Sequence, residues 1–359
     1  MSQNARREPP PELIDVRADE RFDVERVREY LSGKLAGSER PLSVRQFGGG
    51  HANLTYQLCY GEGDDAVEYV LRRPPLGPVA ATSHDMNREY RVLSKLWKAF
   101  PKAPRAFLFC DDPAVIGAEF VVMERRRGIV VRAFIPPEFG GGKDPVANRK
   151  LSEVVIGTLV EFHAVDPVSV GLESLGKPAG FLERQVTGWT GRYERAKTGE
   201  IPIANEVNRW LLENRPESPP PTLVHNDWKL DNMAVAQDDP GRCVAVYDWD
   251  MCTLGDPLCD FGTLLGLWSD AGEGLAGNNP MPTQTPGFMS RDEATRCYCE
   301  RTGLDPARIP YYVVFGTFKM AVVLQQIYYR YHVGQTQDDR FAGMGKIAES
   351  LFVLAGERR

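Results

Sequence analysis

Two short polar stretches in the second half of the chain carry the residue types best suited to catalysis. The first is His225-Asn226-Asp227-Trp228-Lys229-Leu230-Asp231-Asn232, which directly follows the apolar run Thr222–Val224. The second begins at Asp248, where another apolar run ends. Carboxylates and an amide in this arrangement suit phosphoryl transfer, which needs a carboxylate to orient the attacking hydroxyl and metal ions to neutralise phosphate oxygens.

Each of these side chains has an expected role in such a reaction. Asp227 is predicted to accept the proton of an acceptor hydroxyl, and Lys229 to place its ammonium on the γ-phosphate, where negative charge develops. Asn232 and Asp248 offer an amide and a carboxylate oxygen, which are ligand types that Mg²⁺ prefers. We therefore expect a catalytic carboxylate beside a magnesium site, with ATP or GTP as the phosphate donor.

A glycine-rich turn near the N-terminus fits the binding of nucleotide phosphates. It contains Gly49 and Gly50, continues through His51 to Asn53, and lies between two runs that read as strands. Backbone N–H groups of such a turn can point at phosphate oxygens. These four residues are predicted to cover the phosphates of the nucleotide.

A cation on the third predicted strand completes the predicted phosphate site. Arg72 ends that strand, and its forked guanidinium could clamp the α- and β-phosphates. Glu89, on the helix predicted to follow, would hold Arg72 in position. Arg73 is the alternative if the register of the strand differs by one residue.

Two differently built halves must position these residues. Up to residue 123 the pattern has mainly period two, which is typical of strands, and beyond Arg127 apolar residues recur mainly at helical spacing. We predict an α+β fold with a β-rich N-terminal lobe at residues 1–123, a hinge at 124–128 and a mainly helical C-terminal lobe at 129–359. The predicted N-terminal strands are Ser43–Phe47, Thr55–Tyr60, Val67–Arg72, Ala106–Cys110 and Glu119–Met123, with an inserted helix at Asp85–Phe100.

The helical half contains three further features. Ser290-Arg291-Asp292-Glu293 fits a capping box that opens a helix. Ser269–Phe288 is rich in Gly, Pro, Asn and Thr, and is predicted to be a long loop. Tyr311–Tyr331 is the most apolar stretch, yet it contains Lys319 and two glutamines, so we interpret it as a buried helix rather than a membrane span.

The composition narrows the classes of partner. The 359 residues carry a net charge of −6, with 42% hydrophobic and 26% charged residues, as in ordinary globular proteins. No nucleic-acid or membrane partner is expected from this charge. The seven cysteines form no CxxC pair and the five histidines no ligand-spaced pair, so no zinc site is predicted. No secretory signal is visible, and a cytoplasmic location is expected. The composition carries no signal of oligomeric state.

The combined motifs resemble the kinase-like aminoglycoside phosphotransferase family. The catalytic stretch is followed by Asp248-Trp249-Asp250 and then by Gly255-Asp256-Pro257-Leu258-Cys259-Asp260. This pattern is most similar to the kinase-like domain fused to some acyl-CoA dehydrogenases, and the resemblance runs from about Phe47 to Trp268. Asn226 departs from the family pattern, which has glycine between the His and the Asp.

The resemblance implies a protein-kinase-like bilobal fold and further residue roles. Glu124 would lie at the hinge that receives the adenine ring, and Met123, just before it, would either pack near the ring or be a plain core residue. Asp256 and Asp260 resemble structural carboxylates that brace the catalytic loop and cap the following helix. His225 and Asp250 are likewise expected to support the structure of the site rather than to take part in the chemistry.

The acceptor is expected to be a small molecule with a hydroxyl group. Four side chains at helical spacing, Gln185, Trp189, Arg192 and Tyr193, could line its pocket in the C-terminal lobe. The resemblance to the dehydrogenase-linked branch favours a hydroxyacyl-CoA or a related hydroxy acid over a polycationic antibiotic.

Three classes of function stay open at this point. The first is an active small-molecule kinase. The second is a catalytically silent, nucleotide-binding regulatory protein of the same fold, and the third is a metal-dependent hydrolase that uses the same carboxylates. A protein kinase is disfavoured, because the chain has no Asp-Phe-Gly, no Ala-Pro-Glu and no arginine before Asp227.

Overall fold

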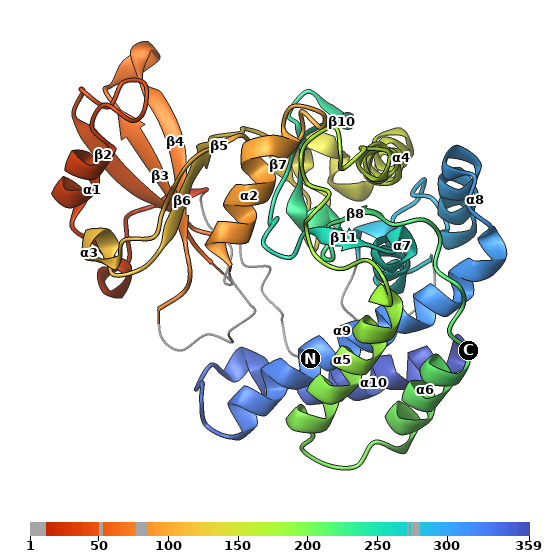
Figure 1. The fold of residues 1–359 in the computed structure, drawn as a ribbon. Helices are drawn as coiled ribbons and strands as arrows, with labels where there is room; N and C mark the ends of the chain where they lie inside the picture. The colour runs from red at the N-terminus through yellow and green to blue at the C-terminus, as the bar shows by residue number, and fades with distance from the viewer. Residues whose placement is uncertain (1–11, 50–52, 77–84, 271–272, 274–280) are drawn as a thin grey trace. The chain divides into compact units, whose positions relative to one another are not determined.

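The computed structural model describes residues 12–49, 53–76, 85–270, 273 and 281–359. They divide into two compact units (Figure 1). The first unit ends at Arg126 but also includes Asp248–Met251, and the second comprises Arg127–Tyr247 and Cys252–Arg359. The chain first changes unit within the segment predicted to be a hinge. The predicted domain limits and the hinge role themselves stay predictions.

An antiparallel six-stranded sheet forms the first unit, in the order β1-β2-β3-β4-β6-β5. The strands are β1 (Leu13–Ile14), β2 (Leu42–Phe47), β3 (Leu54–Tyr60), β4 (Val67–Arg73), β5 (Ala106–Cys110) and β6 (Phe120–Glu124), and the helices are α1 (Val24–Leu31), α2 (Met86–Leu96) and α3 (Pro113–Ile116). The five predicted strands and the inserted helix are present. The short strand β1 and the helix α3 were not predicted.

Local capping and an apolar stripe fix the helix that carries Glu89. The carboxylate of Asp85 accepts a hydrogen bond from the backbone N–H of Arg88 and so caps α2. Met86, Val92, Leu93 and Leu96 are buried, as is Glu89 among them. One face of α2 therefore presents a carboxylate to the interior of the unit.

The second unit is mainly helical. Its helices are α4 (Pro145–His163), α5 (Phe181–Ala196), α6 (Pro202–Glu213), α7 (Pro257–Gly266), α8 (Arg291–Thr302), α9 (Ile309–His332) and α10 (Met344–Glu357), and its strands are β7 (Ile129–Val130), β8 (Thr222–Val224), β9 (Met233–Ala236), β10 (Asp239–Val246) and β11 (Thr253–Gly255). The strands form two small sheets, β10-β9-β7 and β11-β8. The capping box predicted at Ser290 is present and opens α8.

Helices α5, α6, α9 and α10 pack together, and α9 also packs along α7 (Figure 1). The contact between α7 and α9 depends on glycines, because a Cβ on Gly266 would lie 2.8 Å from the carbonyl carbon of Gly316. A Cβ on Gly316 would in turn collide with the carbonyl oxygen of Gly262. The two helix backbones can approach this closely only because those side chains are absent.

Helix α9 has the length and the composition of a membrane span. A core helix passes the same test, and 61% of the most apolar part of α9 is buried inside the protein. Lys319 and Gln325 on this helix are buried and bonded to backbone carbonyls of Asn226 and Ala196. These contacts are those of a helix in the core of the second unit.

Candidate active site

The catalytic stretch follows β8 and is held by a buried carboxylate on α7. Asp260 accepts hydrogen bonds from the backbone N–H groups of His225 (2.5 Å) and Asn226 (2.6 Å). His163 lies 3.3 Å from the same carboxylate. Burial alone would raise the pKa of Asp260, but the hydrogen bond and charge of His163, together with His225, hold it below its ordinary value. An ionised Asp260 thus anchors both residues that precede Asp227.

Asn226 adopts a left-handed backbone conformation, with φ of +67°. Asparagine tolerates this region better than most residues other than glycine. Its backbone N–H is bonded to Asp260, and its carbonyl oxygen accepts a hydrogen bond from the Lys319 ammonium at 2.6 Å. The peptide group that leads into Asp227 is therefore fixed from both sides.

The side chains of Asp227, Lys229 and Asn232 form one cluster. The Lys229 ammonium lies 2.7 Å from one carboxylate oxygen of Asp227 and 2.9 Å from the other. The amide nitrogen of Asn232 donates to the carboxylate of Asp227 at 2.7 Å and to its backbone carbonyl at 2.9 Å. The Asp227 side chain is 29% exposed. A braced carboxylate is thus open to solvent, as a proton acceptor must be.

The structure pairs Lys229 with Asp227 itself rather than leaving its ammonium unbound. Contact of Lys229 with a γ-phosphate stays a prediction and would require the side chain to change partner. The orientation of Asn232 suits its predicted role, because the amide nitrogen faces Asp227 and the oxygen remains the ligand atom. Within the parts of the chain that the structure describes, three or more His, Cys, Asp or Glu side chains nowhere gather as a metal cluster.

His225 and Trp228 connect the catalytic stretch to the elements around it. One ring nitrogen of His225 lies 2.9 Å from the carbonyl oxygen of Tyr247, and the other accepts from the Asp227 N–H at 3.3 Å. Trp228 is buried and donates to the carbonyl of Val155 on α4. Tyr247 also donates its backbone N–H to Asn232 at 2.8 Å. Tyr247, the residue directly before Asp248, is therefore hydrogen-bonded to the catalytic stretch through both of its backbone polar groups.

Asp256 has the geometry of a helix cap. Its carboxylate accepts from the Leu258 N–H at 2.9 Å at the start of α7 and from the Tyr312 hydroxyl at 2.6 Å. Asp260 lies inside α7 and does not cap it. The two carboxylates were predicted together to brace the loop and cap the helix. In the structure Asp256 caps the helix and Asp260 braces the loop.

In the first unit, the predicted phosphate clamp forms a buried ion-pair network. One guanidinium nitrogen of Arg72 lies 2.7 Å from Glu89, and another is bonded to Asp248. Asn53 donates to Asp250 at 3.4 Å. Burial, together with Asp248 and Asp250, raises the pKa of Glu89 to about 7, although Arg72 opposes the rise. One arginine is thus shared among several carboxylates.

The contacts of Arg73 show which of the two arginines at the end of β4 faces the carboxylates. Arg73 donates to the backbone carbonyls of Glu20 and Ile116 and to the hydroxyl of Tyr56. Arg73 is therefore a buried structural arginine, and Arg72 faces the carboxylates.

The remaining predicted nucleotide residues lie around the same sheet. Gly49 is exposed in a bend after β2, whereas Gly50 and His51 fall outside the described residues. Met123 is buried in β6. The backbone N–H of Glu124 donates to the carbonyl of Arg105 at 2.8 Å. That N–H is used within the sheet, so recognition of a purine edge would rest on other backbone groups of the segment.

The four predicted acceptor residues differ in their surroundings. Trp189 is buried on α5 and donates its indole N–H to Gln185 at 3.3 Å. Arg192 is partly exposed and lies with its guanidinium carbon 4.3 Å from the centre of the Trp189 ring. Tyr193 is fully buried against Phe318 and Phe352. A role of Tyr193 in lining an acceptor pocket stays a prediction, because helical spacing does not distinguish a core face from a cleft face.

Lys319 is the residue near Asp227 that the sequence analysis did not assign to the site. From the sequence alone, this lysine only counts against a membrane span. A single cation inside a strongly apolar helix is expensive to bury and therefore signals a specific polar partner. Here that partner is the carbonyl oxygen of Asn226.

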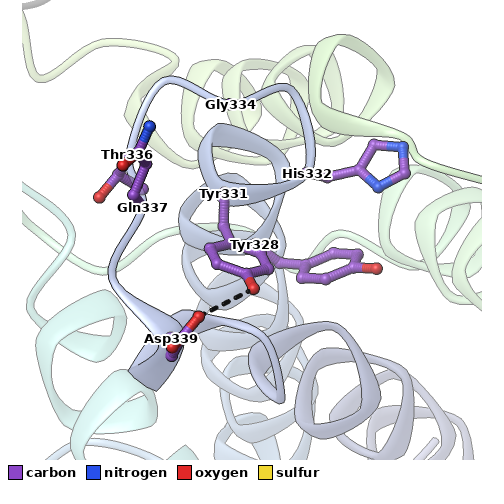
Figure 2. Close-up of a pocket in the computed structure, with 7 residues that line it drawn as sticks. All are labelled: Tyr328, Tyr331, His332, Gly334, Thr336, Gln337 and Asp339. Atoms are coloured by element: carbon purple, nitrogen blue, oxygen red, sulfur yellow. Dashed lines mark hydrogen bonds between the residues drawn. The ribbon is translucent and has the colours of Figure 1, made fainter.

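Neither of two cavities that stand out in the described part of the second unit contains Asp227 or a predicted acceptor residue. One of ≈ 390 Å³ lies at the C-terminal end of α9 (Figure 2). Tyr331 there lies 3.3 Å from Asp339. The other, of ≈ 310 Å³, includes Asp256 in its lining. We assign no function to either cavity.

Comparison with known proteins assigns the chain to a family. Residues 43–279 match the phosphotransferase enzyme family, abbreviated APH. The chain belongs to this family. The predicted family and the prediction of a phosphotransferase are thereby confirmed.

Relatives of this APH chain include the acyl-CoA dehydrogenase family member 11 of Gallus gallus. The two are 32% identical over 354 residues, which cover 95% of this chain and 44% of that protein. The Homo sapiens family member 11 is 30% identical over 338 residues, or 91% of this chain and 42% of the relative. The chain thus spans less than half the length of the curated relatives that it matches.

Solved structures confirm the predicted protein-kinase-like α+β fold. A putative aminoglycoside phosphotransferase from Ralstonia eutropha is 28% identical, with a TM-score of 0.76 over 94% of this chain and 98% of that one. A choline kinase from Cryptosporidium parvum has a TM-score of 0.61 at 11% identity, over 94% and 95% of the two chains.

Proposed function

We propose that this APH chain transfers the γ-phosphate of ATP or GTP to a hydroxyl group of a small-molecule acceptor. The observation that carries the proposal is the cluster around Asp227, in which a partly exposed carboxylate is held by Asn232 and Lys229 on a loop anchored by Asp260. Membership of the phosphotransferase family supports the reaction class. The kinase-like fold supports the use of a nucleotide.

In the proposed reaction, Asp227 accepts the proton of the acceptor hydroxyl. The hydroxyl oxygen forms the new bond to the γ-phosphorus while the bond from that phosphorus to the β-bridging oxygen breaks, so the nucleoside diphosphate leaves. Lys229 moves from Asp227 to the γ-phosphate and balances the charge that develops there. Arg72 binds the α- and β-phosphates, and Glu89 restrains its guanidinium.

A divalent metal is part of this proposal. The oxygen of Asn232 and the carboxylate of Asp248 are its proposed ligands, and both are hard oxygen donors that suit Mg²⁺. When bound, the metal neutralises phosphate charge. Asn232 fits the role because its amide nitrogen is already committed to Asp227.

For the acceptor, we propose a hydroxyacyl-CoA or a related hydroxy acid. The matching relatives are acyl-CoA dehydrogenase family members, of which this chain covers one part. A phosphotransferase region within such proteins would act on a hydroxylated acyl compound more readily than on an antibiotic.

The test measures ATP and GTP binding with and without Mg²⁺, and then transfer of labelled γ-phosphate to a panel of hydroxyl compounds. Metal-dependent binding followed by transfer is expected. Nucleotide binding without transfer to any compound would favour the silent regulatory protein. Metal-dependent cleavage of phosphate compounds in the absence of nucleotide would favour the hydrolase.

A further inference from the structure

Two cations contact one aromatic ring close to the catalytic stretch. The guanidinium of Arg192 lies 4.3 Å from the centre of the Trp189 ring, and the ammonium of Lys319 lies 5.5 Å from the same centre. Lys319 is only 7% exposed and is bonded to the carbonyl of Asn226. A continuous series of contacts therefore connects Arg192 to the residue that precedes Asp227.

The described residues place no carboxylate in salt-bridge contact with this cationic group. Among the described residues, neither Arg192 nor Lys319 has a carboxylate oxygen within the 4.0 Å of a salt bridge. Burial and the neighbouring Arg195 lower the pKa of the Arg192 guanidinium, with no opposing acid among the described residues. Burial likewise lowers the pKa of Lys319, with Asp227 and Asp260 in opposition. Cations that are partly desolvated without a carboxylate partner favour a ligand of opposite charge.

We propose that Arg192 binds an anionic group of the acceptor, a carboxylate or a phosphate, while the acceptor hydroxyl lies at Asp227. The inference rests on the proposed function, because it assigns the charge of the molecule that is phosphorylated. The planar fork of Arg192 can donate two parallel hydrogen bonds to either group. A polycationic acceptor would instead meet Arg192 and Lys319 with like charge and would be rejected.

The stacking on Trp189 gives the guanidinium a fixed position. An arginine that lies over an indole ring loses less side-chain freedom when it binds an anion than one that moves freely in solvent. Gln185 accepts the indole N–H and thereby restrains the ring. Two of the predicted acceptor residues thus support the third, Arg192, which contacts the ligand.

The experiment compares acceptors that share a hydroxyl and differ in charge. One pair is a hydroxy acid and its methyl amide, and the other is a hydroxyacyl-CoA and the corresponding N-acetylcysteamine thioester, which lacks the phosphates. The natural protein is expected to use the charged member of at least one pair about 10-fold better in kcat/KM, the value of a charge-assisted hydrogen bond. The pair that shows the preference identifies carboxylate or phosphate as the anion.

Matched variants locate the effect. Arg192→Gln is expected to raise the KM for the charged acceptor by roughly 10- to 100-fold, with the KM for nucleotide and the use of the neutral acceptor unchanged. Arg195→Gln removes the same charge from an exposed position on the same helix and should leave all these constants unchanged. Arg192→Lys keeps the charge without the fork and should fall between the two.

Acceptor binding without nucleotide supplies a readout that does not need transfer. Calorimetry should show that the charged acceptor binds the natural protein and that Arg192→Gln weakens its affinity about 10-fold. If this holds while no acceptor is phosphorylated, the anion site stands and the proposed function fails. If neutral and charged acceptors are used equally, or if Arg192→Gln and Arg195→Gln behave alike, the anion site is wrong while the phosphotransferase stands.

Discussion

Asp227 is the residue on which the proposed chemistry depends. Asp227→Asn preserves the size of the side chain and removes its ability to accept a proton, so we expect kcat to fall by about 100-fold or more. Nucleotide affinity should stay within about twofold, because the carboxylate acts on the acceptor. Steady-state kinetics and nucleotide titration would measure both. Asp238→Asn, an exposed change, is the control. An unchanged kcat in the Asp227 variant would remove Asp227 from the mechanism.

Asp260 should control stability as well as loop geometry. Its folded-state pKa is lowered, so the ionised carboxylate adds stability above the ordinary carboxyl pKa of about 4. That contribution is lost as the pH falls through the folded-state pKa. Asp260→Asn should therefore lower the free energy of unfolding near neutral pH by about 2–4 kcal/mol, since it disrupts charged, buried hydrogen bonds.

Chemical denaturation of both proteins across the acid range would test the Asp260 prediction. The difference in stability between the natural protein and the variant should shrink on acidification. A difference that stays constant down to the pH at which both unfold would show that the charge of Asp260 does not stabilise the loop.

At the scale of single residues, contacts between residues close together in the sequence could be predicted. The spacing of Asp227 and Asn232 predicts that they share a loop, and the structure bonds them directly. The bond from Lys319 to Asn226 could not be predicted, because 93 positions separate the two residues. For Tyr193, the helical spacing identified the face of α5 on which it lies. Its burial could not be predicted, because it depends on Phe318 and Phe352 from helices distant in the sequence.

At the scale of elements, the contact between α7 and α9 sets the depth of Lys319. Gly316 lies one helical turn before this lysine, and a Cβ there would collide with the backbone of α7. Gly316→Ala should therefore destabilise the protein by about 1–3 kcal/mol through overpacking. Thermal unfolding would measure the change.

Gly188→Ala supplies the control for the glycine prediction. Gly188 lies in α5, and a Cβ there would meet no atom within 4 Å. Because alanine favours the helix more than glycine does, this change should stabilise by about 0.5–1 kcal/mol. If the Gly316 variant also gained stability, the close approach of α7 and α9 would not constrain the fold.

Elements were predicted well where pattern and chemistry agree. Ser290 and Glu293 share the capping box that opens α8, and the apolar alternation predicts β2 to β6 within one or two residues. Strand β1 was not predicted because two residues are too few to show a period, and because its pairing with β2 is non-local. Helix α10 was omitted although Ala348, Leu351, Phe352 and Ala355 do lie at helical spacing.

At the scale of the whole molecule, the division into units is not collinear with the chain. Asp248–Met251 belongs to the first unit, while Tyr247 and Cys252 on either side belong to the second. A sequence pattern assigns consecutive residues to one lobe and could not foresee this exchange. Trp249 in this segment is fully buried and packs edge-on against Phe100, with ring centres 6.1 Å apart.

Trp249→Ala should therefore destabilise the first unit, although the residue lies far along the chain. The loss of a buried tryptophan is expected to cost about 3–5 kcal/mol. Hydrogen exchange should accelerate in β4 and β6. Trp210→Ala, which removes a ring stacked on Tyr311 in the second unit, is the control and should spare those strands. Equal acceleration by both variants, or none by Trp249→Ala, would contradict the assignment of this segment to the first unit.

The place of Trp249 also bears on synthesis. Residues up to Arg126 leave the ribosome before the rest of the first unit, because Trp249, which packs against Phe100, and the Asp248 carboxylate bonded to Arg72 follow more than a hundred residues later. At roughly 5–20 residues per second, that interval lasts several seconds or longer. During that interval the contact of Phe100 with Trp249 and the ion pair of Arg72 with Asp248 cannot yet form. Completion of the first unit is therefore coupled to translation of the second.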